Sequence, residues 1–431
     1  MKPRVDGGAD LRIEIRRAGP SVDIVAVDPV SQAECYIADS IDSAVIQKVN
    51  QYLWNQLERA VKKVPTDPNL YMRVGHDSLA ELFNVGFAAL LMLTENSSPG
   101  RVDDVQAFCR SRVRPTLRRS GPVSILHLVF ERRDHIPFEL MPLFGKPARE
   151  GGRVPTIEEF AELLPAFSVV CTHADLNTST EPREQKPTRL SVRFFRNTSL
   201  VGSVKEYSHL SKLQRRGKVD LPILFPPKNF RRHNQFPELD IAERVADGWR
   251  HDTKRRADSP SQVCHFACHI VPSDDGSTLV LKANGLWAQK VSYRLDFISV
   301  AIQSTHLIPP APMLCFLSAC KSGATDAQLL TSAVTAFTWC RPQSIVGVLA
   351  SVPDVAAAAV AARFYEELSE GTPIGLALRI ARLHLLDPTT YNNPFGLLYI
   401  SYFGEHRRIR TGADTIAKFI PTEEPTTIKG V

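Results

Sequence analysis

The 431-residue sequence lacks the short motifs that mark several common enzyme classes. It contains no Gly-x-Ser-x-Gly nucleophile elbow, no glycine-rich phosphate loop ending in Lys-Ser or Lys-Thr, and no His-Glu-x-x-His zinc signature. Because the chemistry of each class needs those residue types at that spacing, serine hydrolase, nucleotidase and metallopeptidase functions are left without support.

Cysteine is present but does not suggest a disulfide framework, because the eight residues are scattered and several lie in apolar runs, where a thiol acts as a small hydrophobe. No apolar signal segment follows the first residues. The most hydrophobic stretch, from Leu82 to Leu93, includes Asn84 and is too short to span a bilayer. We therefore expect a reducing, cytoplasmic location and no membrane span. The cysteines are Cys35, Cys109, Cys171, Cys264, Cys268, Cys315, Cys320 and Cys340.

The composition is that of a globular protein, with 43% hydrophobic and 23% charged residues and a formal net charge of +6. The positive charge is concentrated between Lys205 and Arg232 and again at Lys254 to Arg256. We interpret this stretch as a solvated insertion rather than a nucleic-acid site, because its aromatic residues do not form a base-stacking motif. A protease-sensitive loop that controls access to a site is a third interpretation.

The first 120 residues predict a small sheet followed by helices. Period-two alternation in Leu11–Arg16 and Val22–Val27, with a Gly-Pro turn between them, indicates a β-hairpin, extended by residues 33–37. Apolar residues at helical spacing predict helices over residues 43–63, 78–94 and 102–117. The hairpin is interpreted as an appended sheet.

Beyond Gly121, buried strands alternate with amphipathic helices, which is typical of a mostly parallel sheet covered on both faces. Ser351 and Asp354 have capping-box spacing before one of these helices. Residues 174–188 and 212–234 are polar and proline-bearing and predict surface loops, and residues 407–431 predict a flexible tail. The strands are expected at 123–130, 167–170, 190–195, 263–267, 313–318, 344–349 and 397–402, and the helices at 239–249, 327–339, 355–368 and 374–386.

Two segments contain the side chains that best fit a catalytic role. Val263–His269 and Met313–Gly323 each begin as an apolar run and reach a reactive side chain, His269 in the first and Cys320 in the second. The carboxyl ends of neighbouring parallel strands meet at one edge of a sheet, so these side chains are expected to lie together. An imidazole beside a thiol produces the thiolate, which is the nucleophile of cysteine peptidases.

These segments belong to a wider pattern that resembles the CHAT domain, a caspase-like cysteine peptidase related to separase. The resemblance covers residues 76–404 roughly, with the motifs in the family order. They are Ile136–Met141, His265–His269, Leu317–Gly323, Phe337–Pro353 and Phe364–Gly371. The resemblance implies a caspase-like three-layer α/β sandwich with a mostly parallel central sheet. It also implies three regions: an N-terminal hairpin and helix region (1–75), the CHAT peptidase domain (76–406) and the tail (407–431).

The resemblance also implies a His269/Cys320 dyad, with the backbone N–H groups of Ile270 and Cys320 holding the oxyanion. The family usually has glycine where this chain has Ile270, and a tryptophan that Ala350–Asp354 lacks. Ile270 therefore favours the alternative hypothesis, a catalytically inactive scaffold that binds a protein or nucleic acid through its N-terminal sheet and basic insertion.

The remaining expectations concern ligands and partners. Asp274, Asp275 and Asp354 are candidates for a pocket that takes a basic substrate side chain, although loop and cap roles explain them equally well. No cofactor is expected, and no metal, because strand alternation separates the cysteines from the histidines of residues 264–269. The resemblance implies a protein substrate, gasdermin-like or another effector, in bacterial defence or regulated cell death. The sequence leaves the oligomeric state open.

Overall fold

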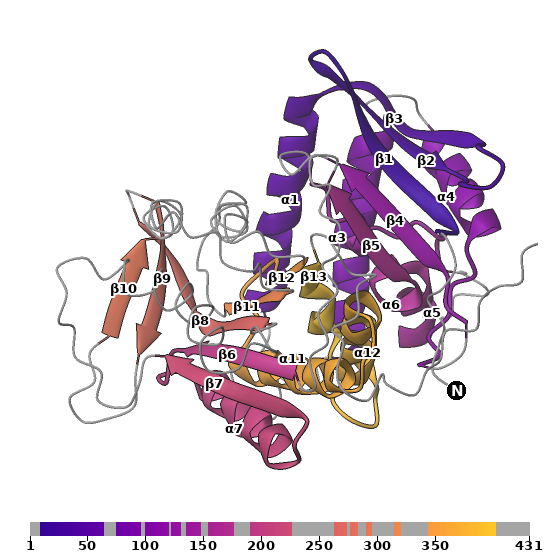
Figure 1. Ribbon diagram of the computed structural model, residues 1–431. Coiled ribbons are helices and arrows are strands. Elements are labelled where there is room, and N and C mark those ends of the chain that lie inside the picture. Colours follow the sequence, from indigo (N-terminus) through magenta and orange to yellow (C-terminus); the bar gives the residue numbers. More distant parts are fainter. Residues whose placement is uncertain are drawn as a thin grey trace, which may run out of the picture.

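The computed structural model describes most of the predicted strands and several of the helices (Figure 1). The predicted helices at 239–249 and 327–339 and the tail at 407–431 lie outside the described residues. The described residues are 9–63, 75–95, 100–119, 122–130, 135–147, 154–175, 190–225, 263–273, 276–282, 290–294, 314–319 and 344–401.

The first sheet has five strands in the order β3-β2-β1-β4-β5. The predicted hairpin is present as β1 and β2, which are antiparallel, and β3 extends it. The hairpin is not a separate sheet, however, because β1 also pairs in parallel with β4, and β4 pairs with β5. The bounds are β1 Leu11–Ala18, β2 Ser21–Val27, β3 Glu34–Asp42, β4 Ile125–Phe130 and β5 Val170–Asp175.

Helices cover the apolar face of this sheet, onto which the alternate residues Leu11, Ile13 and Ile15 of β1 are buried. The helix predicted to run to residue 117 ends earlier, at Arg112, because Val113 is already extended and Pro115 disfavours helix in the residue before it. The bounds are α1 Ser43–Lys62, α3 Gly75–Glu95, α4 Arg101–Arg112, η2 Phe138–Leu140, α5 Ile157–Leu163 and α6 Pro165–Ser168.

Helix α3 is longer than the hydrophobic stretch that the sequence indicated. It has 21 residues with a mean hydropathy of 1.3 over its most apolar window, so by length and composition it is a candidate membrane span. The stretch from Leu82 to Leu93 is thus one part of a longer helix whose length and composition match those of a span. In the structure, half of that window is buried inside the protein, where α3 packs with α1 and α5.

The second sheet has eight strands, and its central run is β7-β6-β8-β11-β12-β13. Neighbours in this run are parallel except β12 and β13, and β9 and β10 add an antiparallel hairpin to β8. This arrangement confirms the predicted α/β class with a mostly parallel central sheet. The bounds are β6 Leu190–Arg196, β7 Val219–Phe225, β8 Val263–Ser273, β9 Gly276–Lys282, β10 Lys290–Arg294, β11 Leu314–Ala319, β12 Ser344–Val348 and β13 Tyr399–Ser401.

The interpretation of the basic stretch as an insertion is wrong for its described part. Helix α7 (Val201–Arg215) and strand β7 follow β6 as a β-α-β unit, so the predicted loop at 212–234 begins with the last turn of a helix and a sheet strand. Leu210 and Leu213 bury one face of α7, and Val219 is buried in β7. The cations Lys205, Lys212, Arg215 and Arg216 lie on the exposed side of this helix.

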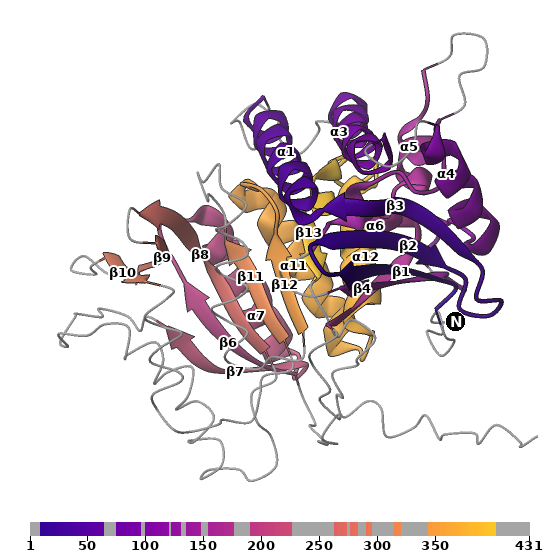
Figure 2. The same ribbon diagram turned by 90° about the horizontal axis from the view of Figure 1, so that it is seen from above.

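Helix α12 (Ile374–Leu386) lies between the two sheets, next to α11 (Asp354–Ser369), as Figure 2 shows. Every residue of α12 except His384 is buried. Arg382 donates from Nε to the carbonyl oxygen of Tyr399 in β13, at 3.0 Å, and from Nη1 to that of Ala166 in α6, also at 3.0 Å. One guanidinium thus joins a strand of the second sheet to the helix that precedes β5 of the first sheet. A short helix, η3 (Pro394–Leu398), leads from this region into β13.

A second buried arginine of α12 binds the chain just after α4. Arg379 donates to the carbonyl oxygens of Thr116 and Arg118, the latter at 3.1 Å. Burial lowers the pKa of Arg379 to about 10, which leaves the guanidinium charged at neutral pH. Hydrogen bonds to charged donors are stronger than those between neutral groups, so these contacts fix α12 firmly in place.

Gly86 gives a test of the packing between α3 and η2. A Cβ at this position would lie 1.9 Å from the carbonyl oxygen of Leu140, and backbone cannot move away cheaply. We therefore expect Gly86→Ala to lower the free energy of unfolding by about 1–3 kcal/mol, although alanine is the better helix former. Urea unfolding measures this, with Asn84→Ala on the exposed side of α3 as the control. An unchanged or raised midpoint for Gly86→Ala would contradict the close approach.

Candidate functional site

Strands β8 and β11 lie side by side in parallel, in a continuous register from Val263 and Leu314 to Cys268 and Ala319. The predicted catalytic residues come next in the chain after the last pair, His269 after Cys268 and Cys320 after Ala319. His269 is a residue of β8, but its side chain lies outside the described part of the structure, as does the whole of Cys320. The structure therefore brings their neighbours in the chain together.

Strand β8 does not end at Ala267, as the sequence indicated, but continues to Ser273. It changes neighbours on the way: β6 pairs with it up to Ala267, and β9 pairs with it from His269 onward. Asn197, which is completely buried, joins the two parts. Its backbone N–H donates to the Ala267 carbonyl oxygen at 2.8 Å, and its Nδ2 donates to the Val280 carbonyl oxygen in β9 at 3.2 Å.

Ile270 has an ordinary extended backbone as part of β8 and pairs with Leu279 of β9. A β-branched residue suits this conformation, so the freedom that glycine gives is not needed here. Successive peptide groups of a strand point to opposite sides. Because the Ala267 carbonyl points toward β6, the alternation directs the peptide groups of residue 269 toward β9 and those of Ile270 toward the β11 side.

Of the three predicted pocket aspartates, only Asp354 is described, and Asp274 and Asp275 lie outside the described residues. Asp354 is the first residue of α11 and is partly exposed. The backbone of Asp354 packs directly against Gly202 of α7, where a Cβ would lie 2.2 Å from the Asp354 carbonyl oxygen. The start of α11, and with it the position of Asp354, is thus fixed by α7.

The predicted capping box at Ser351 is wrong. The N-cap of α11 is Pro353, without a side-chain hydrogen bond. Ser351 instead donates from its backbone N–H and its hydroxyl to Glu58 of α1, at 2.8 and 2.9 Å. The spacing of serine and aspartate matches the motif, but the Ser351 hydroxyl donates to the buried carboxylate of Glu58, which is distant in sequence.

A buried polar cluster lies on the face of β8 and β11 that α7 and α11 cover. Glu206 of α7 lies 2.6 Å from Nε2 of His265 in β8 and accepts a 2.9 Å hydrogen bond from the hydroxyl of Ser318 in β11. Nδ1 of His265 lies 2.8 Å from the hydroxyl of Tyr365 in α11. All four side chains are almost completely buried. One carboxylate therefore connects the two strands that lead to the predicted dyad.

The protonation of this cluster follows from its burial. Burial, and then the Glu206 charge, raise the pKa of Tyr365 well above its ordinary value, so the phenol stays protonated at neutral pH. Its O–H then donates to Nδ1 of His265, which leaves the proton on Nε2 facing Glu206. Each polar group has a partner in this arrangement.

As part of an apolar run, His265 is expected in the core, and Glu206 is not among the predicted site residues. His265 is indeed buried, but its role is polar as well as steric. The missed signal is the position of Glu206 within α7, where Gly202, Leu210 and Leu213 form the buried stripe that also contains this carboxylate. A charge at an apolar position of a helix indicates a buried partner.

The opposite face of the sheet is packed with thiols and aromatic rings. Cys264 and Cys315 are Cα partners, and a hydrogen bond from Cys315 lowers the pKa of Cys264. Burial raises the pKa of Cys268. Phe195 and Phe266 stack with ring centroids 4.5 Å apart. These cysteines have the packing role that the sequence predicted, and both faces of the sheet are buried.

The comparison with protein families now identifies the chain. It matches the CHAT domain over residues 113–416, well over half of its length. The chain therefore belongs to the CHAT domain family, as its motifs predicted.

Solved structures that are similar to this chain include those of a yeast complex, and a search of curated proteins found no match. Two crystal structures of the Saccharomyces cerevisiae separase–securin complex, at 2.6 and 3.0 Å resolution, each share 10% sequence identity with this chain at a TM-score of 0.41. The matches cover 92% and 91% of this chain and 30% of the other chain in each case. The chain thus spans less than a third of the length of those proteins.

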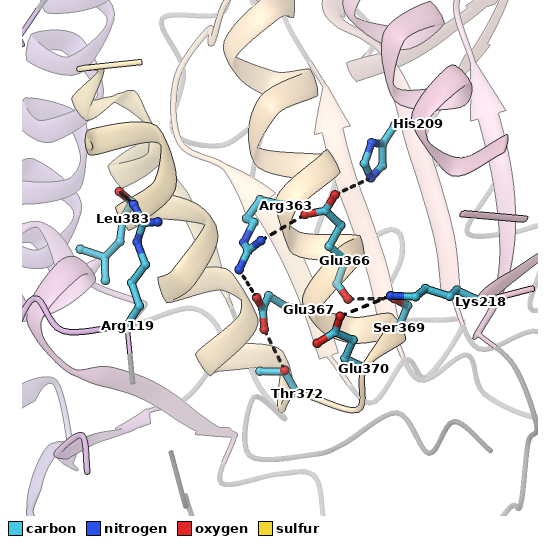
Figure 3. Close-up of polar contacts among 10 residues, drawn as sticks. All are labelled: Arg119, His209, Lys218, Arg363, Glu366, Glu367, Ser369, Glu370, Thr372 and Leu383. Carbon is cyan, nitrogen blue, oxygen red and sulfur yellow. Dashed lines mark hydrogen bonds and ion pairs between the residues drawn. The ribbon is translucent and has the colours of Figure 1, made fainter. Parts of the chain in front are cut away.

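The buried Glu206–His265 pair has an exposed counterpart that serves as a control (Figure 3). His209 of α7 lies 3.7 Å from Glu366 of α11, and both side chains are partly exposed. Removing Glu206 leaves the Nε2–H of His265 buried without an acceptor, so we expect Glu206→Ala to lower the free energy of unfolding by about 1–3 kcal/mol. Glu366→Ala is expected to change it by about 0–1 kcal/mol.

Urea unfolding of the two variants, followed by tryptophan fluorescence, measures this difference. Similar small losses for Glu206→Ala and Glu366→Ala would show that the cluster does not connect the strands energetically. A double-mutant cycle with His265→Phe measures the interaction energy between Glu206 and His265. The loss of stability from Glu206→Ala should be smaller when its histidine partner is already absent.

Proposed function

We propose that this chain is a caspase-like cysteine endopeptidase in which His269 is the general base and Cys320 the nucleophile. His269 takes the thiol proton, and the thiolate attacks the carbonyl carbon of the scissile peptide bond. The protonated imidazole then gives this proton to the leaving amine, and the C–N bond breaks. Water attacks the resulting thioester, with His269 again as base, and releases the carboxylate product and the free thiol. No cofactor takes part.

The observation that carries this proposal is the register of β8 and β11. Cys268 and Ala319 are the last Cα partners of the parallel pairing, and each directly precedes a proposed catalytic residue. Ligand sites of α/β proteins lie at the carboxyl ends of parallel strands, next to the point where the strand order reverses. Here β6 leads to β7 on one side and β8 leads to β11 on the other, so the reversal falls between β6 and β8.

The backbone at Ile270 supports the oxyanion role. Its N–H is directed to the side of β8 that β9 does not use, which is the side of β11. A developing oxyanion on a carbonyl attacked by Cys320 would accept from this N–H and from that of Cys320. Because an extended Ile270 fits the site, this departure from the family pattern no longer favours an inactive scaffold.

The proposed substrate is a protein with a basic side chain before the cleaved bond. Asp354 starts α11 at the edge of the sheet where β8 and β11 lead, and Asp274 and Asp275 follow β8 in the chain. Such carboxylates would attract a lysine or arginine. We further propose that the substrate is a gasdermin-like or other effector, cut in the cytoplasm during bacterial defence or regulated cell death.

Covalent labelling tests the nucleophile. We expect a peptidyl chloromethyl ketone with arginine beside the reactive group to alkylate Cys320 faster than its leucine analogue. Cys320→Ala should abolish this label, and His269→Ala should slow it about 100-fold or more, the usual contribution of a general base. Peptide mapping by mass spectrometry identifies the labelled residue.

Burial raises the pKa of Cys109 and of Cys268, so both thiols should stay protonated and unlabelled. A folded wild-type protein that takes up no label at Cys320 would refute the peptidase.

Replacement of Ile270 tests the oxyanion donor. Ile270→Pro removes the N–H, whereas Ile270→Ala keeps it and controls for the lost side chain, which is 3% exposed. We expect Ile270→Pro to be labelled by the chloromethyl ketone about 100- to 1000-fold more slowly than Ile270→Ala, the range for loss of one oxyanion donor. Equal rates in two folded variants would exclude Ile270 from this role.

A further inference from the structure

Helix α1 carries one buried carboxylate, Glu58, which contacts a loop of the second sheet. Glu58 is 5% exposed, and its Oε1 accepts both the backbone N–H and the hydroxyl of Ser351, at 2.8 and 2.9 Å. Figure 1 shows α1 running from β3 to the end of β12. The family match begins only at residue 113, so Glu58 lies in a part of the chain that this match does not cover.

Ser351 lies in the short loop between β12 and α11, which we call the β12 loop (residues 349–353). Strand β12 is the parallel neighbour of β11, in a register that pairs Phe316 with Val346. The β12 loop therefore leaves the sheet at the same edge as the end of β11, and it leads directly into Asp354. In the proposed peptidase, this loop flanks the nucleophile.

A carboxylate is an unfavourable residue for this position if α1 serves only to pack. Leu57 and Val61 next to Glu58 on the helix are buried, as are Leu53 and Val49 one and two turns before Leu57. Burying a charge costs free energy that an apolar side chain of similar size would not cost. Here the two hydrogen bonds from Ser351 offset that cost, and both fix the β12 loop rather than the helix. The Glu58 carboxylate thus stabilises the conformation of the β12 loop.

We infer that Glu58 is a positioning residue for substrate binding: it holds the β12 loop in the shape that accepts the peptide on one side of the nucleophile. This inference rests on the proposed peptidase function. It makes the N-terminal helix a part of the substrate-binding apparatus, although the dyad itself is at other positions. Replacement of Glu58 therefore lowers the affinity for the substrate and leaves the reactivity of the Cys320 thiol unchanged.

Two reagents separate affinity from reactivity. Iodoacetamide alkylates a reactive thiol without needing a peptide site, whereas the arginine chloromethyl ketone must first bind along the loops. We expect Glu58→Ala and Ser351→Ala to raise the inhibition constant KI of the chloromethyl ketone about tenfold, because a hydrogen bond to a charged group is lost. The maximal inactivation rate and the iodoacetamide rate at Cys320 should stay within about twofold of wild type.

Conservative and control variants exclude a general structural effect. Glu58→Gln keeps an oxygen that accepts from Ser351 and should restore KI to within about threefold of wild type. Glu81→Ala removes an exposed partner of Lys63 at the end of α1 and should leave KI unchanged. Hydrogen exchange of the peptide that contains residues 344–353 should be faster in Glu58→Ala than in Glu81→Ala.

The outcomes are distinct. An unchanged KI in folded Glu58→Ala and Ser351→Ala, with Cys320 labelled at the wild-type rate, would overturn the inference and leave the peptidase standing. A parallel fall of both labelling rates would also overturn it, since that is the result of a disturbed fold. If wild-type Cys320 reacts with neither reagent, the peptidase itself fails and the substrate role of Glu58 fails with it, whatever hydrogen exchange shows of the loop.

Discussion

The constraint on which the rest of the structure depends is the burial of α12 between two sheets. A helix with almost no exposed residue has to give every polar side chain a partner, and Arg379 and Arg382 find theirs in backbone carbonyls of both halves of the molecule. Elements β1, α1 and α3, which lie before the start of the family match, are packed into the same core. The fold of the CHAT domain is therefore completed by elements that precede the family match.

The candidate site depends on what lies beneath it as much as on the residues at the sheet edge. Strands β8 and β11 are paired along their backbones, connected through Glu206 on one face and packed through Cys264 and Cys315 on the other. Rigid strands position side chains more accurately than loops do, and a buried network limits the shear between them. In the proposed peptidase, loops then have only to shape the substrate site, which is the role that we propose for the β12 loop and Glu58.

Sequence patterns predicted those elements whose own residues determine them. Helix α12 was predicted with its observed bounds, and β6 and α11 within one residue, because long periodic or continuous apolar runs give a strong signal. Charge concealed the amphipathic pattern of α7, and Pro222 concealed β7. The extension of β8 and the partner of Ser351 depend on Asn197 and Glu58, which are distant in sequence. The pairing of Cys268 with Ala319 likewise depends on tertiary contacts, so the residue types of the site could be predicted and their register could not.

Strand β8 pairs with β6, β9 and β11, so the site depends on whether the number of residues between Ala267 and Ile270 stays even. The carbonyl oxygen of Ala267 accepts from Asn197, and the N–H of Ile270 is directed toward β11. From one residue to the next between them, the peptide groups point to opposite sides of the strand. One residue inserted or deleted there would turn the N–H after the histidine toward β9 and exchange the two faces of the strand, even with every side chain retained. Length variation is therefore incompatible with the site between Ala267 and Ile270.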